Sequence, residues 1–260
     1  DDVRFRVNGY LSSTGNNFVA RKIETEIPAI EKLGLPEAML EIMKYDNGLV
    51  LVTGPTGSGK STSLAALINK LNEDRQGNII TVEDPIEYVH PSKKCIVSQR
   101  EVGRDAVSFA HALKAMLRED PDIILVGEMR DMETISLALT AAETGHLVFG
   151  TLHTNGAANS INRIIDVFPS EQQAQIRAQL SQSLRLVVTQ QLLRKASGAG
   201  RVAAFEVMVN NPAIANMIRE NKVFQIPQAM QTGKSQGMMT MEDSLKQLLM
   251  MGIINEEALA

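Results

Sequence analysis

The chain has 260 residues, of which 44% are hydrophobic and 4% aromatic. This length allows one large α/β domain or two smaller ones, built around a core of aliphatic side chains. The 26 basic and 30 acidic residues give a net charge of −4, which argues against a nucleic-acid-binding domain, because such domains usually carry a basic excess.

The single cysteine, Cys95, excludes an internal disulfide and a structural zinc site made of several cysteines, and it favours a reducing compartment. No apolar run approaches the ~20 residues of a transmembrane helix, and the start of the chain carries no signal-peptide pattern. The chain opens without an initiator Met, so we expect the native protein to extend further upstream.

Residues 1–25 have the pattern of two strands joined by a turn. Apolar residues alternate with arginines over residues 3–7, turn-forming residues occupy 12–17, and a second strand is expected over 18–23. Two strands alone are marginally stable in water. We therefore expect this segment to be the end of a domain that begins upstream.

From residue 47 the pattern alternates between strands and helices. Short apolar runs predict buried strands over residues 48–53, 78–82, 123–126 and 146–152. Apolar residues at helical spacing predict helices over residues 61–71, 108–119, 132–143, 157–168 and 171–185, and a short helix over 37–44 lies in the connector that precedes them. Residues 94–102 indicate a more polar strand, for which antiparallel pairing is one option.

This alternation predicts an α/β fold, a mostly parallel sheet with helices on both faces. Ligands of such sheets bind at the carboxyl ends of the strands. Gly54, Glu83, Glu128 and His153 each follow a predicted strand, so we expect them to meet at one edge of the sheet.

The last part of the chain changes character. Residues 187–194 and 201–209 flank a Ser-Gly-Ala-Gly turn and predict a hairpin. After Asn211 the chain turns helical and rich in Met, and we interpret these methionines as adaptable core or as an oligomer contact.

A phosphate-loop spacing, G-x-x-x-x-G-K-[ST], stands between the strand over 48–53 and the helix over 61–71. This placement aims backbone N–H groups and the positive end of the helix dipole at phosphate oxygens. Lys60 is expected to reach the β- and γ-phosphates, and the Ser61 hydroxyl to bind Mg²⁺. The predicted site for a nucleoside triphosphate comprises Gly54, Pro55, Thr56, Gly57, Ser58, Gly59, Lys60, Ser61 and Thr62.

Hydrolysis also needs a group that positions the attacking water. Glu128 is the first candidate, because it follows an apolar strand. Asp122 precedes the same strand, so we place it at the far edge of the sheet and exclude it. Glu83 follows another strand and could assist the base. Either Glu83 or Glu128 could hold Mg²⁺ through water, and a turn cap beside Asp84 is the alternative role for Glu83.

Two histidines border one predicted strand. His146 and His153 are seven positions apart, which places them on opposite faces, so they should not share a metal ion. His153 stands at the carboxyl end, where the γ-phosphate is expected. His146 stands at the other end, where a packing role is expected.

Phosphoryl transfer needs positive charge at the transition state, often from an arginine finger. The residues alone leave the candidates open, and these are Arg6, Arg21, Arg104, Arg118 and Arg130. A finger from a neighbouring subunit would make the protein an obligate oligomer.

Several segments resemble the secretion-type ATPases, the hexameric motors of type IV pili and type II secretion. ITVEDPIEY over residues 80–88, LREDPDIILVGEMRD over 117–131 and AAETGHLVFGTLHTN over 141–155 are similar to the Asp box, Walker B and His box of that family. RVAAFEVMV over 201–209 and PAIANMIRENK over 212–222 extend the resemblance, which points to the group that retracts pili in twitching motility. Ala215 departs from that group, which often has Arg there.

The resemblance implies a RecA-like core, the remnant of a PAS-like N-terminal domain and a homohexameric ring. It implies that Glu128 is the catalytic glutamate, that Glu83 is the Asp-box glutamate and that His153 belongs to the His box. By position, Arg6 and Arg21 match the N-terminal arginines that the family brings to the nucleotide. The implied parts are the end of the PAS-like domain over residues 1–25, a linker over 26–46, the ATPase domain over 47–210 and a helical subdomain over 211–260.

The implied activity is Mg²⁺-dependent ATP hydrolysis coupled to pilus retraction through pilin depolymerisation. The implied place of work is the cytoplasmic face of the bacterial inner membrane, against a platform membrane protein and without nucleic acid. A pilus-assembly or type II secretion motor is the alternative, although the chain lacks the four-cysteine metal element common in those relatives. A DNA translocase fits the acidic charge poorly, and a non-hydrolysing switch fits poorly with intact Lys60, Ser61 and Glu128.

Overall fold

The computed structural model describes residues 4–23 and 26–259. The strands are β1 (Arg4–Ser12), β2 (Gly15–Ile23), β3 (Gly48–Thr53), β4 (Gly77–Glu83), β5 (Cys95–Glu101), β6 (Ile123–Val126), β7 (Leu147–Leu152), β8 (Leu184–Arg194) and β9 (Arg201–Val209). The α-helices are α1 (Glu37–Glu41), α2 (Lys60–Asp74), α3 (Phe109–Met116), α4 (Met132–Glu143), α5 (Ala157–Asp166), α6 (Ser170–Ser183), α7 (Pro212–Arg219), α8 (Ile226–Thr232) and α9 (Met241–Met250). Short 3₁₀ helices are η1 (Ile30–Lys32), η2 (Ile42–Lys44), η3 (Val223–Gln225), η4 (Lys234–Gln236) and η5 (Glu256–Leu259).

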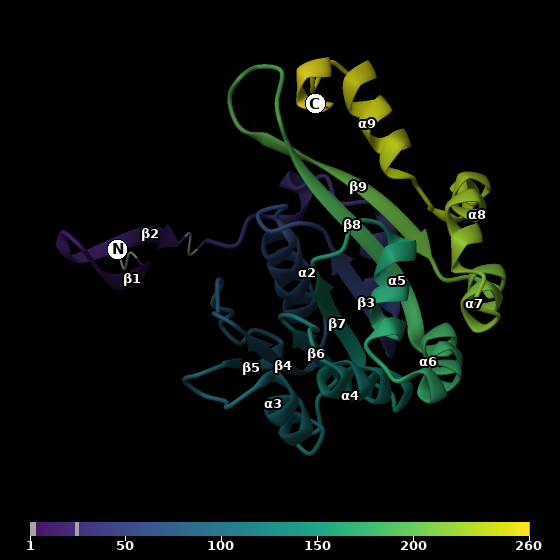
Figure 1. Cartoon of the computed structure of the whole chain (residues 1–260), viewed down its shortest axis with the longest axis horizontal. Coiled ribbons are helices and arrows are strands. Elements are labelled where there is room, and N and C mark those ends of the chain that lie inside the picture. Colours follow the sequence, from purple (N-terminus) through teal and green to yellow (C-terminus); the bar gives the residue numbers. More distant parts are fainter. Residues whose placement is uncertain (1–3, 24–25, 260) are drawn as a thin grey trace.

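The central sheet has seven strands in the order β5-β4-β6-β7-β3-β8-β9 (Figure 1). All neighbouring strands pair in parallel except β8 and β9, which form an antiparallel hairpin. The mostly parallel α/β sheet expected from the alternating pattern is therefore confirmed.

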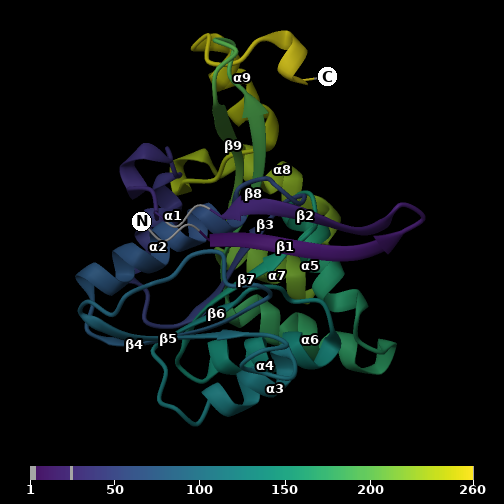
Figure 2. The same cartoon turned by 90° about the vertical axis from the view of Figure 1, so that its left-hand side faces the viewer.

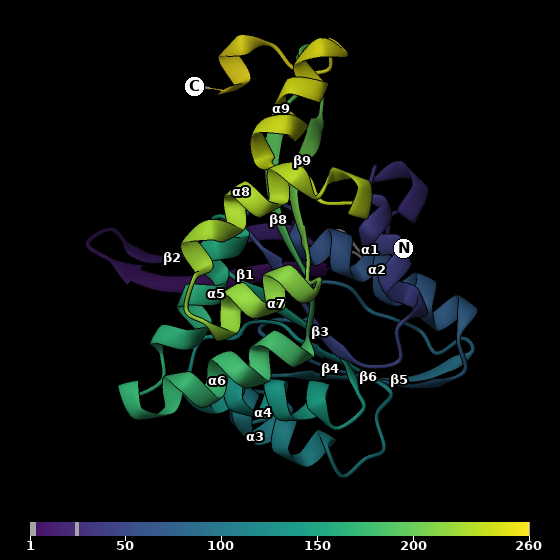
Figure 3. The same cartoon turned by 90° about the vertical axis from the view of Figure 1, so that its right-hand side faces the viewer.

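Helices cover both faces of this sheet, as Figure 3 shows with α1 and α2 on one side and α4, α6 and α7 on the other. The alternation along β3 explains the two layers, because successive side chains of a strand point to opposite faces. Leu49 and Leu51 join the core under α3 to α8, whereas Val50 and Val52 join the core under α1 and α2. Both layers are aliphatic, as the composition predicts.

Side-chain caps fix the starts of several helices. The Ser108 hydroxyl accepts the His111 N–H at 3.1 Å at the start of α3, and the Asp131 carboxylate accepts the Thr134 N–H at 2.9 Å at the start of α4. The predicted end of α3 was too late. The helix stops at Met116 because the chain turns before Pro121, with Asp120 at a φ of 52°.

One strand differs from the sequence-based expectation. β5 pairs with β4 in parallel, with Cys95 beside Gly77, so the antiparallel option is wrong. A parallel neighbour requires the chain to return to the amino end of the sheet, and residues 84–94 make this return. Buried Asn72 on α2 anchors it, since its amide donates to the Pro91 carbonyl at 2.8 Å and accepts the Lys93 N–H at 3.0 Å.

The N-terminal strands form a separate two-stranded hairpin, which projects from the rest of the molecule (Figures 1 and 2). The turn is shorter than predicted, because Ser12 already pairs with Gly15. Apolar side chains on this hairpin are exposed, among them Leu11 at 78% and Phe18 at 74%.

The long β8–β9 hairpin extends beyond the sheet and carries α9 along one side (Figure 1). Leu193, Ala204 and Ile254 form a small core of their own there. Some methionines of this region are buried and others are exposed. Met230 and Met238 are buried, whereas Met250 is 87% exposed. Across residues 4–23 and 26–259, no helix combines the length and apolar character needed to cross a membrane.

Candidate nucleotide site

The phosphate loop runs from the end of β3 to the start of α2. Gly54 and Gly59 have φ values of 134° and 90°. Residues other than glycine rarely adopt such values. Both glycines also lie against Gln190 of β8, which leaves no room for a Cβ atom at either position. The glycine spacing is therefore required by backbone conformation and by packing together.

Lys60 opens α2 and is 8% exposed. Its ammonium group donates to the carbonyls of Gly54 and Pro55 at 2.7 and 3.0 Å, so the lysine folds back over its own loop. Burial lowers the pKa of Lys60, while the charges of Glu128 and Glu87 oppose this shift. A phosphate placed over the loop would give the ammonium group a stronger partner than these two carbonyls.

The two hydroxyl residues after the lysine face different surroundings. Ser61 is exposed at the first turn of α2, where a metal ion beside a phosphate could reach it. The Thr62 hydroxyl forms a 3.0 Å hydrogen bond with the Tyr88 hydroxyl of the 84–94 segment. This hydrogen bond links the 84–94 segment, which connects β4 and β5, to the start of α2.

The sheet register brings the strand ends together. Thr53 pairs with Leu152 and Val126 pairs with both Val82 and Gly150. Because these strands are parallel, the residues that follow them emerge at one edge. The structure therefore places Gly54, Glu83, Glu128 and His153 at one edge, as the sequence predicts.

Glu128 is held by two neighbours. Arg130 contacts both carboxylate oxygens at 2.5 Å, and His153 Nε2 lies 3.3 Å from Oε2. Burial alone would raise the pKa of Glu128, but the hydrogen bond from Arg130 and the charges of His153 and Arg130 outweigh it, so the pKa is lowered. The carboxylate is therefore ionised and able to accept a proton or to orient a water molecule.

His153 connects Glu128 to the phosphate loop. Its Nδ1 lies 3.5 Å from the Thr56 hydroxyl, on the side opposite the contact with Glu128. His146 stands at the amino end of β7, where Nδ1 contacts the Ala141 carbonyl at 2.9 Å. The separation of the two histidines expected from the sequence is confirmed.

Glu83 has a different environment from Glu128. Its carboxylate accepts hydrogen bonds from the Thr81 hydroxyl at 2.7 Å and the Gln99 amide at 3.1 Å. Burial raises the pKa of Glu83 despite these bonds, and the nearby charges of Glu87 and Glu101 raise it further. Two carboxyl groups at one edge thus have pKa values shifted in opposite directions, an arrangement typical of acid–base sites.

The other predicted residues lie elsewhere. Asp122 is at the amino end of β6, where its carboxylate accepts the Asn78 N–H at 2.7 Å, so its exclusion is confirmed. Arg6 and Arg21 pair in the register of the N-terminal hairpin, but their side chains lie outside the described residues. Arg104 forms an ion pair with Asp105.

Sequence reasoning missed two contacts of the site. Arg130 was one of five candidate fingers, and nothing in its spacing indicated that it would pair with Glu128. Gln190 is not among the sequence-based candidates, although Thr189, Gln190 and Gln191 interrupt the apolar run of β8. Polar residues inside a buried strand are the signal that could have identified it.

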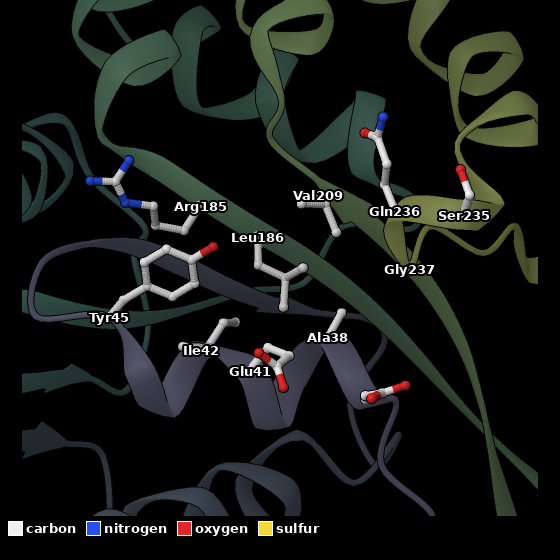
Figure 4. Close-up of a pocket in the computed structure, with 11 residues that line it drawn as sticks. Ala38, Glu41, Ile42, Tyr45, Arg185, Leu186, Val209, Ser235, Gln236 and Gly237 are labelled. Carbon is white, nitrogen blue, oxygen red and sulfur yellow. The ribbon is translucent and has the colours of Figure 1, made fainter.

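Two cavities of similar size lie in different places. One, of about 360 Å³, adjoins the phosphate loop between Pro55, Asn155, Gln190 and Glu206. The other, of about 350 Å³, lies between α1, the start of β8 and η4, with Tyr45 and Arg185 at one end (Figure 4). No residue of the phosphate loop lines the second cavity, so the loop, the strand ends and the first cavity define the candidate site.

Comparison with known proteins identifies the family. The type II/IV secretion system proteins match residues 1–211. The chain belongs to the type II/IV secretion system protein family. Among its relatives, the type IV pilus retractation ATPase PilT of Pseudomonas aeruginosa is 56% identical over 254 residues, which cover 98% of this chain and 74% of the relative. The twitching motility protein of Neisseria gonorrhoeae is 54% identical over 255 residues, which cover 98% of this chain and 68% of that protein.

Solved structures of the secretion family agree with this fold. The crystal structure of the pilus retraction motor PilT with bound ADP superposes with a TM-score of 0.91 at 52% identity, covering 98% of this chain and 72% of that one. The ATPase DotB of Legionella pneumophila superposes with a TM-score of 0.88 at 34% identity, covering 98% of this chain and 72% of that one.

Proposed function

We propose that this chain is the ATPase of a type IV pilus retraction motor, which couples ATP hydrolysis to pilin depolymerisation and twitching motility. The observation that carries the proposal is the 56% identity to a pilus retraction ATPase over 98% of the chain. The candidate site supports it, because a phosphate loop and an ionised carboxylate share one sheet edge.

Residues 54–62 cradle the phosphates, with Lys60 moving from its two carbonyl partners to the β- and γ-phosphates. Glu128 orients the attacking water and accepts its proton. His153, between Thr56 and Glu128, holds the carboxylate in register with the loop. Glu83, with its raised pKa, supports the base from the neighbouring strand.

Mg²⁺ fits this site with few protein ligands. Within the described part of the chain, no group of three or more His, Cys, Asp or Glu side chains is arranged to hold a metal ion. Mg²⁺ characteristically keeps waters and binds substrate phosphates with one or two side chains. Ser61 would ligate it, with Glu83 or Glu128 acting through water, and the ion would neutralise charge on the transferred phosphoryl group.

The assembly that we propose is a homohexamer in which Arg6 and Arg21 of one subunit reach the nucleotide of the next. Residues 1–25 would be the end of a PAS-like domain, 26–46 a linker, 47–210 a RecA-like ATPase domain and 211–260 a helical subdomain. The ring would act on a platform protein at the cytoplasmic face of the inner membrane, and on pilin only indirectly. The acidic charge of the chain gives no support to a nucleic-acid partner.

Cells that carry the full-length protein with Lys60→Ala test the proposal. Excess pili by electron microscopy, together with lost surface motility, is the expected result. Lys70→Ala is a matched control on the same helix, because Lys70 pairs with Asp74 at the surface and should leave both readouts unchanged. Bald cells would indicate a pilus-assembly motor and overturn the retraction assignment.

A further inference from the structure

Gln190 of β8 lies against the phosphate loop from a strand that carries none of the catalytic candidates. Its side chain is buried, with 3% of its surface exposed. The Ser63 hydroxyl, in the first turn of α2, donates a 2.9 Å hydrogen bond to Gln190 Oε1. Gln190 thus ties the start of α2 to the central sheet.

Both ends of the phosphate loop also abut Gln190. A Cβ atom on Gly59 would stand 2.7 Å from Gln190 Nε2, and a Cβ atom on Gly54 would collide with the Gln190 carbonyl oxygen. The loop backbone therefore approaches this residue as closely as glycine permits. Next to it, the hydroxyls of Thr53 and Thr189 form a buried 2.9 Å hydrogen bond, which joins β3 and β8 just before the loop begins.

A buried amide within a strand is unfavourable unless its polar atoms have partners. Val188, two positions earlier on β8, is buried and apolar, so an apolar side chain would satisfy sheet packing at position 190 as well. The amide oxygen instead accepts from the Ser63 hydroxyl, and the amide nitrogen lies where a Cβ atom on Gly59 would stand. Its polarity therefore serves the loop rather than the sheet.

We propose that Gln190 is a positioning residue of the nucleotide site. Its amide holds the phosphate loop and the first turn of α2 in the conformation that binds phosphates. The inference rests on the proposed function, because it takes the ligand of the loop to be a nucleotide.

Two substitutions in the full chain test this role, with ADP as the probe. Gln190→Leu removes both polar atoms and leaves a shorter apolar side chain, and it should weaken ADP binding by about tenfold, the size expected for one buried hydrogen bond. Gln190→Glu keeps the acceptor for Ser63 but places a carboxylate beside Gly59. It should weaken ADP binding more than Gln190→Leu does, and more at low salt, because the carboxylate repels phosphate.

Gln175→Leu is the matched control, since Gln175 is an exposed glutamine of α6 and does not line the cavity beside the phosphate loop. It should bind ADP like the unaltered protein. Thermal unfolding without nucleotide separates positioning from packing, because a packing role alone lowers the melting temperature and leaves the ADP affinity of folded Gln190→Leu unchanged. Unchanged ADP affinity in both Gln190 variants would overturn the inference.

Ser63→Ala approaches the same contact from α2 and is informative even if Gln190→Leu does not fold. It should weaken ADP binding in the same direction, and its effect should not add to that of Gln190→Leu, because both remove one hydrogen bond. Full additivity of the two effects contradicts the proposal. If the unaltered protein and Gln175→Leu both fail to bind ADP, the proposed function itself is wrong, which is a different outcome from normal binding by all variants.

Discussion

Glu128 shows how much of a candidate site depends on contacts that spacing does not reveal. Its position after an apolar strand was sufficient to select it, and the register of β6 between β4 and β7 places it at the expected edge. The contacts with Arg130 and His153 could not be predicted, because side chains of short loops take their direction from neighbours that are distant in sequence. These contacts keep the carboxylate ionised.

Glu128→Gln should reduce ATP turnover by about 100-fold or more while ADP affinity stays near normal, since the general base is lost but the phosphate loop is intact. The fold should persist, because an amide oxygen can still accept from Arg130. Steady-state hydrolysis and ADP titration measure the two effects. Glu133→Gln, an exposed acid in the first turn of α4, is the control, and near-normal turnover of Glu128→Gln would remove this residue from the mechanism.

His90 makes the stability of the protein depend on pH. The side chain is 6% exposed and its Nδ1 has no hydrogen-bond partner among residues 4–23 and 26–259, and burial lowers the pKa of His90 from 6.5 to about 4. Between these values the unfolded state binds a proton that the folded state does not. Stability is therefore complete above pH 6.5 and falls as the pH drops toward 4.

The loss amounts to on the order of 3 kcal/mol across this window. In His90→Asn the contribution disappears, so the free energy of unfolding should change less between pH 7 and pH 5 than it does in the unaltered protein. Urea unfolding at the two pH values measures this difference. His111→Gln, at an exposed site, should keep the full dependence, and an identical pH response in all three proteins would contradict the role of His90.

At the scale of elements, the sequence predicted what depends on local periodicity. The strands β3, β6 and β7 and the helix α4 match their expected bounds closely, because continuous apolar runs and side-chain caps mark them. The direction of β5 was not predictable from its own residues. It depends on the return segment 84–94, and that segment is held by Asn72 from a different helix.

The substitution Asn72→Ala should therefore destabilise β5 more than the loss of one small side chain suggests. Removing the amide leaves the Pro91 carbonyl and the Lys93 N–H without their partner, at a cost of about 2–3 kcal/mol in unfolding free energy. Cys95 is a convenient reporter, because it is 2% exposed and starts β5. Its thiol should react with a maleimide faster in Asn72→Ala than in Lys70→Ala, which removes an ion pair with Asp74 within α2, and equal rates would disprove the anchoring role.

At the scale of the whole molecule, two of the five candidate arginines are already engaged within the chain. Arg130 is paired with Glu128, and Arg104 with Asp105. The sheet edge, the loop and the acids could be predicted from one sequence because they belong to one subunit. The proposed relation of Arg6 and Arg21 to a nucleotide could not, because it would depend on how copies of the chain meet.

The proposed sharing of sites between subunits predicts complementation between two inactive proteins. Glu128→Gln subunits would supply the arginines, and subunits with Arg6→Ala and Arg21→Ala would supply the glutamate. Mixed at equal amounts, they should recover part of the ATPase rate that neither shows alone, and the specific activity of the unaltered protein should rise with its concentration. A mixture no more active than its components, with a flat concentration profile, would show that each subunit works by itself.

The exposed apolar residues of the β1–β2 hairpin affect how such measurements are made. Phe5, Val7, Leu11 and Phe18 lie on a two-stranded ribbon with open backbone edges, the arrangement that allows strands of different molecules to add to one another. Sulfate salts strengthen apolar contacts, whereas ion pairs between subunits weaken as salt rises. Turbidity that increases with ammonium sulfate and does not change with ADP would therefore indicate non-specific aggregation through the hairpin. Aggregation of this kind would set the highest protein concentration at which the proposed ring can be observed.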